Sequence, residues 1–478
     1  MNLAMRTLST ICLVLFILAV SACTNKKASN DGETRSVEDL AGSRPNIIFI
    51  MADDLGYGDL GCYGQDKIKS PNIDQLAADG LRFTQTYAGC TVCAPSRSVL
   101  MTGQHTGHTR VRGNFCHVGG TLGYKNNNPR RRLNLFDEDT TVAHVLGEAG
   151  YRTCLSGKWH IGGYNPDAGP LQRGFDEFYG PLTLTSALHS PTYWPPKWYD
   201  NEELFDIAEN QDGRKGYYKT DLITDYAIRF MERNQEDPFF LYIAYSNPHS
   251  PFDAPELGPY EKEDWPMEEK IYAAMIYRLD SCVGRIRQAL DHLSLTDNTI
   301  VFFVSDNGPR SEARDDQTRV VKFFDSNGPL TGYKRDMYEG GIRVPGMVYW
   351  PGKVPAGTTS DVAWYFADVL PTAAALAGAQ SPINIDGINL LPNLADPTLA
   401  SPDRFLYWEF YEPVFQQAVR WKNWKAVRTG LKGELELYDL GEDIAEQKNL
   451  SRENPAVVIA IEKYLVAARV DSEHWIAE

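Results

Sequence analysis

Three short apolar runs, far apart in the chain, restrict its fold more than any other feature of the sequence. They are Asn46–Ala52, Phe239–Tyr245 and Thr299–Ser305. A nearly uninterrupted apolar run of this length is typical of a strand buried on both faces, as in a parallel sheet. Segments with helical patterning alternate with these runs, at residues 70–80, 139–150, 220–234 and 268–293. The alternation predicts an α/β fold with a large, mostly parallel central sheet flanked by helices.

Polar residues follow each of the three runs. Asp53 and Asp54 come directly after the first, and His249 comes shortly after the second. Asp306 and Asn307 come directly after the third. Because open α/β sheets bind ligands beyond the carboxyl ends of their strands, these five residues mark a candidate site.

Four members of this set suit a hard cation. Asp53, Asp54, Asp306 and Asn307 offer carboxylate and amide oxygens, the ligands that Ca²⁺ and Mg²⁺ prefer. A single aspartate after a strand more often caps a loop or a helix. Three aspartates and an adjacent asparagine at matching strand ends favour a metal.

The segment Cys93-Ala94-Pro95-Ser96-Arg97 reads as the start of a helix that ends at Gly103. The Cys93 side chain would then lie at a helix N-terminus, which favours negative charge, and Arg97 would share its face. Two other interpretations remain open on these residues alone. Cys93 could be a structural buried cysteine, or a redox partner of Cys90 in a CxxC motif.

Cationic residues complete the candidate site. Lys158 and His160 alternate along an extended segment after a predicted strand at residues 151–156, so both would point to one side. Arg97, Lys334 and His249 add further positive charge or proton donors. Such groups around a metal favour binding of an anionic tetrahedral ester and stabilise charge on its oxygens.

Taken together, these motifs resemble, in order and spacing, the signature of the type I, formylglycine-dependent sulfatases. The resemblance runs from about Pro45 to Leu437-Tyr438-Asp439-Leu440. The motifs that carry it are Asp53-Asp54, Cys93-Ala94-Pro95-Ser96-Arg97 with Leu100-Met101-Thr102-Gly103, Gly157-Lys158-Trp159-His160, Pro248-His249-Ser250-Pro251-Phe252, Ser305-Asp306-Asn307-Gly308 and Gly332-Tyr333-Lys334. The chain looks most like the arylsulfatase A and N-acetylgalactosamine-6-sulfatase branches, which implies an alkaline-phosphatase-like fold.

The resemblance implies a modified nucleophile and a cofactor. A maturation enzyme would oxidise Cys93 to Cα-formylglycine, whose hydrated form carries two hydroxyls. One hydroxyl, ligated to Ca²⁺, would attack sulfur, and the other would then expel sulfate. The expected ligands of a single calcium ion are Asp53, Asp54, Asp306, Asn307 and the modified Cys93.

The resemblance also implies roles for the other site residues. Arg97 and His160 would orient and deprotonate the hydrated aldehyde. Lys158 and Lys334 would bind the sulfate oxygens. His249 would protonate the leaving alcohol.

The substrate is less constrained. The family branch suggests a sulfated galactose or N-acetylgalactosamine glycan. The basic turn at residues 126–132 either reads a second anionic group or is a solvated loop. The aromatic segment 193–199 and His189 look exposed and suited to stacking on sugars. There are two alternative functions. One is a phosphodiester or phosphonate monoester hydrolase of the same superfamily, and the other is a non-catalytic glycan-binding lipoprotein.

The N-terminus predicts export. Residues 1–22 have the charge and the short apolar core of a signal peptide, and Val20-Ser21-Ala22-Cys23 resembles a bacterial lipobox. Lipid on Cys23 would anchor the protein in the periplasm or at the cell surface, although ordinary signal cleavage also fits. Residues 23–43 are polar and aperiodic, as in a flexible tether.

The C-terminal part has a different pattern. After Gly378, four short strand-like segments and a final helix predict a small subdomain with an antiparallel sheet. The expected domains are therefore a catalytic α/β domain at 44–378 and an α+β subdomain at 379–478. The net charge of −16 argues against nucleic acid as a partner.

Overall fold

The computed structural model describes residues 36–125, 128–163, 166–183, 192–311 and 315–477. The predicted signal peptide, Cys23, most of the tether, the tip of the basic turn (126–127) and His189 lie outside these ranges. No helix within them combines the length and the apolar composition that crossing a bilayer requires.

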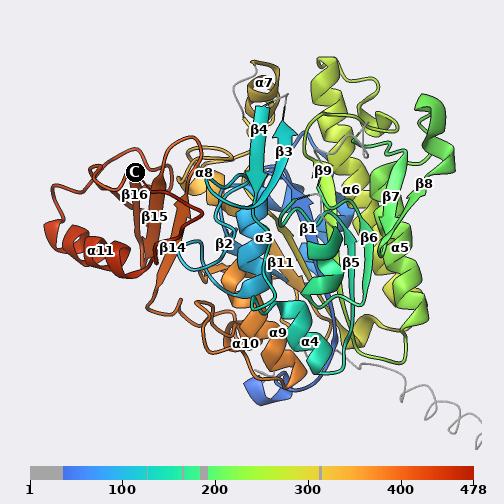
Figure 1. Ribbon diagram of the computed structural model, residues 1–478, viewed down its shortest axis with the longest axis horizontal. Coiled ribbons are helices and arrows are strands. Elements are labelled where there is room, and N and C mark those ends of the chain that lie inside the picture. Colours follow the sequence, from blue (N-terminus) through green and yellow to red (C-terminus); the bar gives the residue numbers. More distant parts are fainter. Residues whose placement is uncertain (1–35, 126–127, 164–165, 184–191, 312–314, 478) are drawn as a thin grey trace, which may run out of the picture. The chain divides into compact units, whose positions relative to one another are not determined.

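In the described chain, eleven strands form the central sheet, in the order β12-β2-β11-β10-β1-β9-β5-β6-β7-β8, with β13 paired to β2. Figure 1 shows this sheet and labels β1, β2, β5, β6, β7, β8, β9 and β11. The five strands from β10 to β6 are mutually parallel, whereas β11, β7 and β8 run antiparallel to their neighbours. The predicted mostly parallel sheet is confirmed. The strands are β1 Asn46–Asp53, β2 Leu81–Tyr87, β5 Arg152–Gly157, β6 Glu177–Gly180, β7 Lys197–Asp200, β8 Glu203–Asp206, β9 Phe239–Pro248, β10 Thr299–Ser305, β11 Arg343–Tyr349, β12 Thr358–Ser360 and β13 Trp364–Tyr365.

Helices cover both faces of this sheet. The alternate residues Ile47, Phe49 and Met51 of β1 belong to a core shared with α3, α4 and α9. Ile48 and Ile50 belong to a second core, shared with α2, α5 and α6. Burial on both faces explains why β1 reads as a continuous apolar run. The helices of the described chain are α2 Pro71–Ala78, α3 Cys93–Thr102, α4 Val142–Glu148, α5 Lys219–Arg233, α6 Met267–His292, α7 Asp315–Phe323, α8 Glu339–Ile342, α9 Val369–Ala377, α10 Leu391–Ala395 and α11 Pro455–Ala467.

Strand register brings the predicted polar residues to one edge. Ala52 of β1 pairs with Ser305 of β10, so Asp53 and Asp306 leave adjacent strands at the same level. On the other side, Asp53 pairs with Pro248 of β9, directly before His249. The predicted meeting of the three strand ends is confirmed.

The C-terminal segments form a separate sheet. Its strands, all antiparallel, are β14 Phe405–Phe410, β15 Gln416–Trp421, β16 Trp424–Thr429 and β17 Glu436–Asp439. α11 packs on this sheet through Ile461 and Leu465. The four strands and the helix match the sequence prediction, while the boundary near residue 378 stays a prediction.

Smaller elements complete the described chain. β3 Thr121–Lys125 and β4 Asn128–Arg132 form an antiparallel hairpin that carries the predicted basic turn. Short 3₁₀ helices lie at Val37–Asp39, Gly61–Tyr63, Pro166–Ala168, Pro170–Arg173, Ala208–Gly213, Gly258–Tyr260, Thr296–Asn298 and Phe366–Asp368.

Candidate active site

α3 fixes the position of Cys93. The helix begins at Cys93 and ends at Thr102, and it is followed by Gly103, whose φ of 68° is the left-handed conformation that glycine adopts without strain. The helix is buried along its whole length, and only 1% of Cys93 is exposed. The predicted helix N-terminus at Cys93 is confirmed.

Two charged groups contact the Cys93 sulfur. Lys334 Nζ lies 3.2 Å from Sγ, and Asp53 Oδ1 lies 3.5 Å from it. Burial, followed by the negative charge of Asp306, raises the pKa of the Cys93 thiol to about 12. An unmodified Cys93 would therefore be a neutral thiol at physiological pH.

The same burial bears on the redox interpretation. Cys90 is fully buried, and burial raises the pKa of its thiol to about 12 as well. Both cysteines are free thiols. Because thiol–disulfide exchange needs an accessible thiolate, these features argue against a redox pair at Cys90 and Cys93.

Two further buried ion pairs join the strand ends to the cationic residues. Lys158 Nζ lies 2.7 Å from Asp53 Oδ2, with both side chains fully buried. Arg97 donates from Nε and Nη2 to Asp306 Oδ2, at 3.0 and 2.7 Å. Arg97 also donates to the Lys158 carbonyl, at 2.9 Å. Each cation therefore fixes one of the predicted metal-ligating carboxylates.

Asp54 is the best-connected carboxylate of the site. Its backbone adopts a φ of 65°, which lets the chain turn sharply after β1. Oδ1 accepts from Lys334 Nζ at 2.5 Å and from Asn307 Nδ2 at 2.8 Å. Burial acts to raise the pKa of Asp54, but the positive charge of Lys334, with those of Arg310 and Lys158, outweighs it and holds the pKa far below its usual range.

The arrangement fits a hard cation. Asp54 Oδ2 and Asn307 Oδ1 are buried acceptors without a hydrogen-bond partner among the described residues. One potential ligand atom each from Asp53, Asp54, Cys93 and His249 lie within 4.8 Å of one another. Unsatisfied oxygens at a cluster of carboxylates are the groups that a calcium ion would bind. Asp306 contributes less directly, because its two oxygens accept from Asp54 N and Arg97.

The two predicted histidines occupy different positions. His249 donates from Nδ1 to the Ser250 carbonyl at 2.5 Å, which leaves Nε2 facing Asp54 Oδ2 at 3.7 Å. His160 accepts at Nε2 from Arg132 Nη1 at 3.0 Å, so its proton lies on Nδ1. Burial lowers the pKa of both rings well below the usual histidine value. His160 has a φ of 59°, so the extended segment predicted there was wrong at this residue.

Sequence reasoning missed three contributors. Arg132 belongs to the basic turn but reaches inward to His160. Tyr242 on β9 contacts Arg97 Nη1 through its hydroxyl at 3.3 Å. Arg310 donates to Ser250 Oγ, beside His249, and its charge helps to lower the pKa of Asp54. Arg310 follows the Ser305-Asp306-Asn307-Gly308 motif by two residues, which was a usable signal.

Comparison with known proteins decides the family. The model of the family "Sulfatase" matches residues 45–379, and that of "N-sulphoglucosamine sulphohydrolase, C-terminal" matches residues 332–470. The chain belongs to the sulfatase family. It is a sulfuric ester hydrolase, as the resemblance of its motifs predicted.

Relatives and a solved structure agree with this assignment. Human arylsulfatase A is 34% identical over 419 residues, covering 81% of this chain and 73% of the relative. Human N-acetylgalactosamine-6-sulfatase is 33% identical over 396 residues, covering 76% and 68%. The crystal structure of Ps i-CgsB in complex with k-i-k-neocarrahexaose is 30% identical, with a TM-score of 0.75, and covers 91% of this chain and 95% of that one.

A large cavity of this sulfatase lies beside the Lys334 side chain. A cavity of about 1040 Å³ is lined by Lys334, the lysine that contacts Cys93. Arg130 and Arg131 of β4 line another part of the same cavity. Arg130 and Arg131 therefore lie on the wall of the cavity that Lys334 also lines.

One sequence interpretation is corrected. Of the aromatic segment 193–199, Tyr193, Trp194, Trp198 and Tyr199 are all at most 8% exposed, so they offer no surface for stacking on a sugar. Tyr193 instead donates from its hydroxyl to the carbonyls of Ser246 and His249, at 2.6 and 2.5 Å. It anchors the loop that carries His249.

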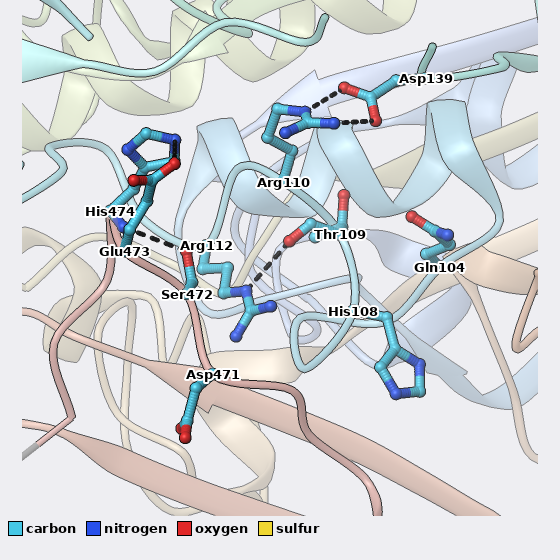
Figure 2. A pocket seen from close by; sticks show the side chains of 10 residues that line it. All are labelled: Gln104, His108, Thr109, Arg110, Arg112, Asp139, Asp471, Ser472, Glu473 and His474. Atoms are coloured by element: carbon cyan, nitrogen blue, oxygen red, sulfur yellow. Dashed lines mark hydrogen bonds and ion pairs between the residues drawn. The ribbon is translucent and has the colours of Figure 1, made fainter. Parts of the chain in front are cut away.

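A second pocket of this sulfatase, of about 370 Å³, is unrelated to Cys93 (Figure 2). Its charged side chains largely form ion pairs with one another or with buried residues next to the pocket. Arg110 donates to both oxygens of Asp139, and Arg112 pairs with the buried Glu409 at 2.8 Å. The pocket shows no excess of one charge that would select a ligand.

His108 of this pocket forms a triad with His105 and Asp386, whose ligand atoms also lie within 4.8 Å of one another. Gly107 N donates to His105 Nδ1 at 3.2 Å, so the proton of His105 lies on Nε2, facing Asp386 Oδ1 at 3.4 Å. A metal at Nε2 would need that proton on Nδ1, against the Gly107 N–H. The triad is therefore better explained by hydrogen bonding than by a metal.

Proposed function

We propose that this sulfatase cleaves a sulfate ester on a carbohydrate, using a formylglycine derived from Cys93 and one bound calcium ion. The observation that carries the proposal is the position of Lys334, whose ammonium contacts both Cys93 Sγ and Asp54 Oδ1. This contact links the nucleophile position to a sulfate-binding cation and to the carboxylate cluster.

The site residues have separable tasks in this proposal. The oxygen of a formylglycine would lie near the position of Sγ, within reach of Lys334. Lys158 and Lys334 would bind the sulfate oxygens and stabilise the charge that develops on them. Arg97 holds Asp306 in place, and Arg132 holds the His160 ring in one tautomer.

Calcium would be held by Asp53, Asp54, Asn307 and the modified Cys93, with Asp306 on the same cluster. When bound, it would lower the pKa of a ligated hydroxyl and neutralise the carboxylates. The orphaned oxygens of Asp54 and Asn307 support this assignment.

His249 is the proposed proton donor to the leaving alcohol. Its Nδ1 is tied to the Ser250 carbonyl, so Nε2 is the atom that would hold the transferred proton. We expect His249→Ala to lower kcat/KM by roughly 10²- to 10⁴-fold for a sugar sulfate, whose alkoxide leaves poorly without a proton. The loss for 4-nitrophenyl sulfate should be less than about tenfold, because nitrophenolate leaves unprotonated. Equal losses on the two substrates, measured by steady-state kinetics, would exclude His249 as the acid.

Two measurements test the proposed function: the mass of the peptide that contains Cys93, and the rates of hydrolysis of sulfate and phosphorus esters. Mass spectrometry of the peptide around Cys93 distinguishes formylglycine from the thiol. Rates with 4-nitrophenyl sulfate, 4-nitrophenyl phosphate and a phosphonate monoester then rank the activities. A preference for the phosphorus esters would favour the related hydrolase, and a thiol without turnover would favour a glycan-binding protein.

The expected substrate is a sulfated galactose or N-acetylgalactosamine glycan. N-acetylgalactosamine-6-sulfatase is among the relatives, and the similar structure of Ps i-CgsB holds a neocarrahexaose. Glycans that carry galactose or N-acetylgalactosamine sulfates are therefore the first substrates to screen.

We also propose that the protein is exported and anchored through lipid on Cys23, in the periplasm or at the surface of a bacterium. Cys23→Ala should move it from the membrane fraction to the soluble fraction, because the site of lipid attachment is lost. Cys12→Ala is the matched control, since Cys12 lies in the apolar core of the signal and would leave with it. Immunoblots of fractionated cells read both variants, and unchanged fractionation of Cys23→Ala would contradict the anchor.

A further inference from the structure

The hairpin formed by β3 and β4 places a row of arginines beside the reacting groups. Arg132, only 4% exposed, reaches inward to His160, while Arg130 and Arg131 are exposed and line the cavity that contains Lys334. β4 is fixed by its pairing with β3 and by Cys116, whose N–H donates to the Arg131 carbonyl at 2.9 Å. The backbone of the two exposed arginines therefore has a defined position on the wall of the cavity that Lys334 lines.

The guanidinium groups of Arg130 and Arg131 make few contacts with the described protein, and the Arg130 group lies 5.8 Å from the centre of the Phe115 ring. Arg130 Nη1 donates to the Pro129 carbonyl at 3.4 Å, and Arg131 Nη1 donates to the Gly119 carbonyl at 3.3 Å. Both hydrogen bonds are long, and neither is to a carboxylate. A guanidinium has five N–H donors, so most of the donors of each side chain remain for a ligand.

The acidic residues of the same cavity are already engaged. Glu412 pairs with Arg335 at 3.0 Å and accepts from Asn114 N at 2.7 Å and Phe115 N at 3.0 Å. Asp336 accepts from Tyr333 N at 2.8 Å. The cavity wall therefore carries two exposed arginines, while its carboxylates already have hydrogen-bond or ion-pair partners. In a chain with a net charge of −16, this wall is a local basic surface.

We propose that Arg130 and Arg131 form a subsite for a second anionic group on the glycan whose sulfate is cleaved. The group is a sulfate or a carboxylate, since each offers two adjacent oxygens that a guanidinium can bind with paired hydrogen bonds. The subsite rests on the proposed function, because it uses the same cavity and substrate. It defines the substrate class as glycans with at least two anionic substituents.

The test compares substrates with and without a second charge. The probes are 4-nitrophenyl sulfate, N-acetylgalactosamine 6-sulfate, N-acetylgalactosamine 4,6-disulfate, and a disaccharide of a uronic acid linked to N-acetylgalactosamine 6-sulfate. The variant is Arg130→Gln/Arg131→Gln. The control is Lys432→Gln/Arg452→Gln, which removes the same charge from two exposed residues beyond β16.

We expect the double variant to lose roughly tenfold or more in kcat/KM on the disulfate or on the uronate disaccharide, mainly through KM. Its rate with 4-nitrophenyl sulfate should stay within about twofold of the wild type, and the control should match the wild type on every probe. Loss on the disulfate alone identifies the second group as sulfate, and loss on the uronate probe alone identifies it as carboxylate. An equal loss on all probes, or no loss on any, would overturn the subsite.

A binding measurement separates this inference from the proposed function. The Cys93→Ala variant is expected not to turn over substrate, so calorimetry gives its affinity for each sugar probe with and without the two arginine substitutions. A tenfold or greater loss of affinity for a doubly anionic probe supports the subsite even if the wild type hydrolyses no sulfate ester. Unchanged affinity refutes the subsite even if the wild type is an active sulfatase.

Discussion

The Cys93→Ala variant is expected to lose sulfatase activity by at least about 10⁴-fold, because the group that becomes the nucleophile is removed. The fold should survive the change. Cys93 packs as a small buried residue, and replacing its sulfur by hydrogen costs on the order of 1 kcal/mol. The measurements are kcat with 4-nitrophenyl sulfate and the midpoint of thermal unfolding.

Cys90→Ser is the control for this experiment. Cys90 is equally buried, and its Sγ lies 3.8 Å from the Glu409 carbonyl, to which a serine hydroxyl can donate. The variant should keep activity within a fewfold of the wild type, since Cys90 makes no contact with the Lys334 or Asp54 side chains. Turnover by Cys93→Ala would exclude the formylglycine mechanism, and inactivation by Cys90→Ser alone would restore the redox interpretation.

Asp54→Asn is expected to abolish binding of the proposed calcium ion and to remove most of the activity. Asparagine keeps the shape of the side chain but withdraws the negative charge that pairs with Lys334 and that would also face the proposed calcium ion. Loss of a charged ligand should weaken calcium binding by roughly 100-fold or more and lower kcat/KM by a similar factor. Calcium per chain is measured by atomic absorption after dialysis, and calcium should raise the unfolding midpoint of the wild type only.

Asp59→Asn is a matched control on the same loop. Asp59 is fully buried, and its Oδ2 accepts from Gly56 N and from the Tyr272 hydroxyl, both at 2.7 Å. Burial raises the pKa of Asp59 to about 6, and it contacts none of the cationic site residues. Asp59→Asn should alter stability but retain calcium and activity. Retention of calcium and activity by Asp54→Asn would contradict the metal site.

The sequence was sufficient to predict the scaffold and the edge at which the site lies. β1, β9 and β10 are buried at every position, so each reads as an apolar run with sharp ends. Where such a run stops, the next polar residue is at the strand end. This rule predicted that Asp53, His249 and Asp306 lie at the ends of their strands. The capping glycine and the proline near the start of α3 located Cys93 in the same way.

The sequence could not predict which charges pair with which. Arg97 is on the same helix as Cys93, yet its guanidinium binds Asp306, more than two hundred residues away. The sequence also could not predict that Arg132 points inward and Arg130 outward, because these directions depend on how the hairpin is oriented relative to the site. The prediction that Tyr193 is exposed was wrong for a related reason. An aromatic cluster between prolines has the same sequence pattern whether it lies on the surface or beneath a loop.

The burial of Cys93 implies an order for chain folding and the proposed modification of Cys93. In the folded chain its sulfur lies beneath Lys334 and Asp53, and only 1% of the residue is accessible. An oxidising enzyme could not reach it there, so the proposed conversion to formylglycine would have to happen while the polypeptide is still unfolded. Modification and folding would thus compete in time. A chain that folds first would be trapped as a stable but inactive molecule.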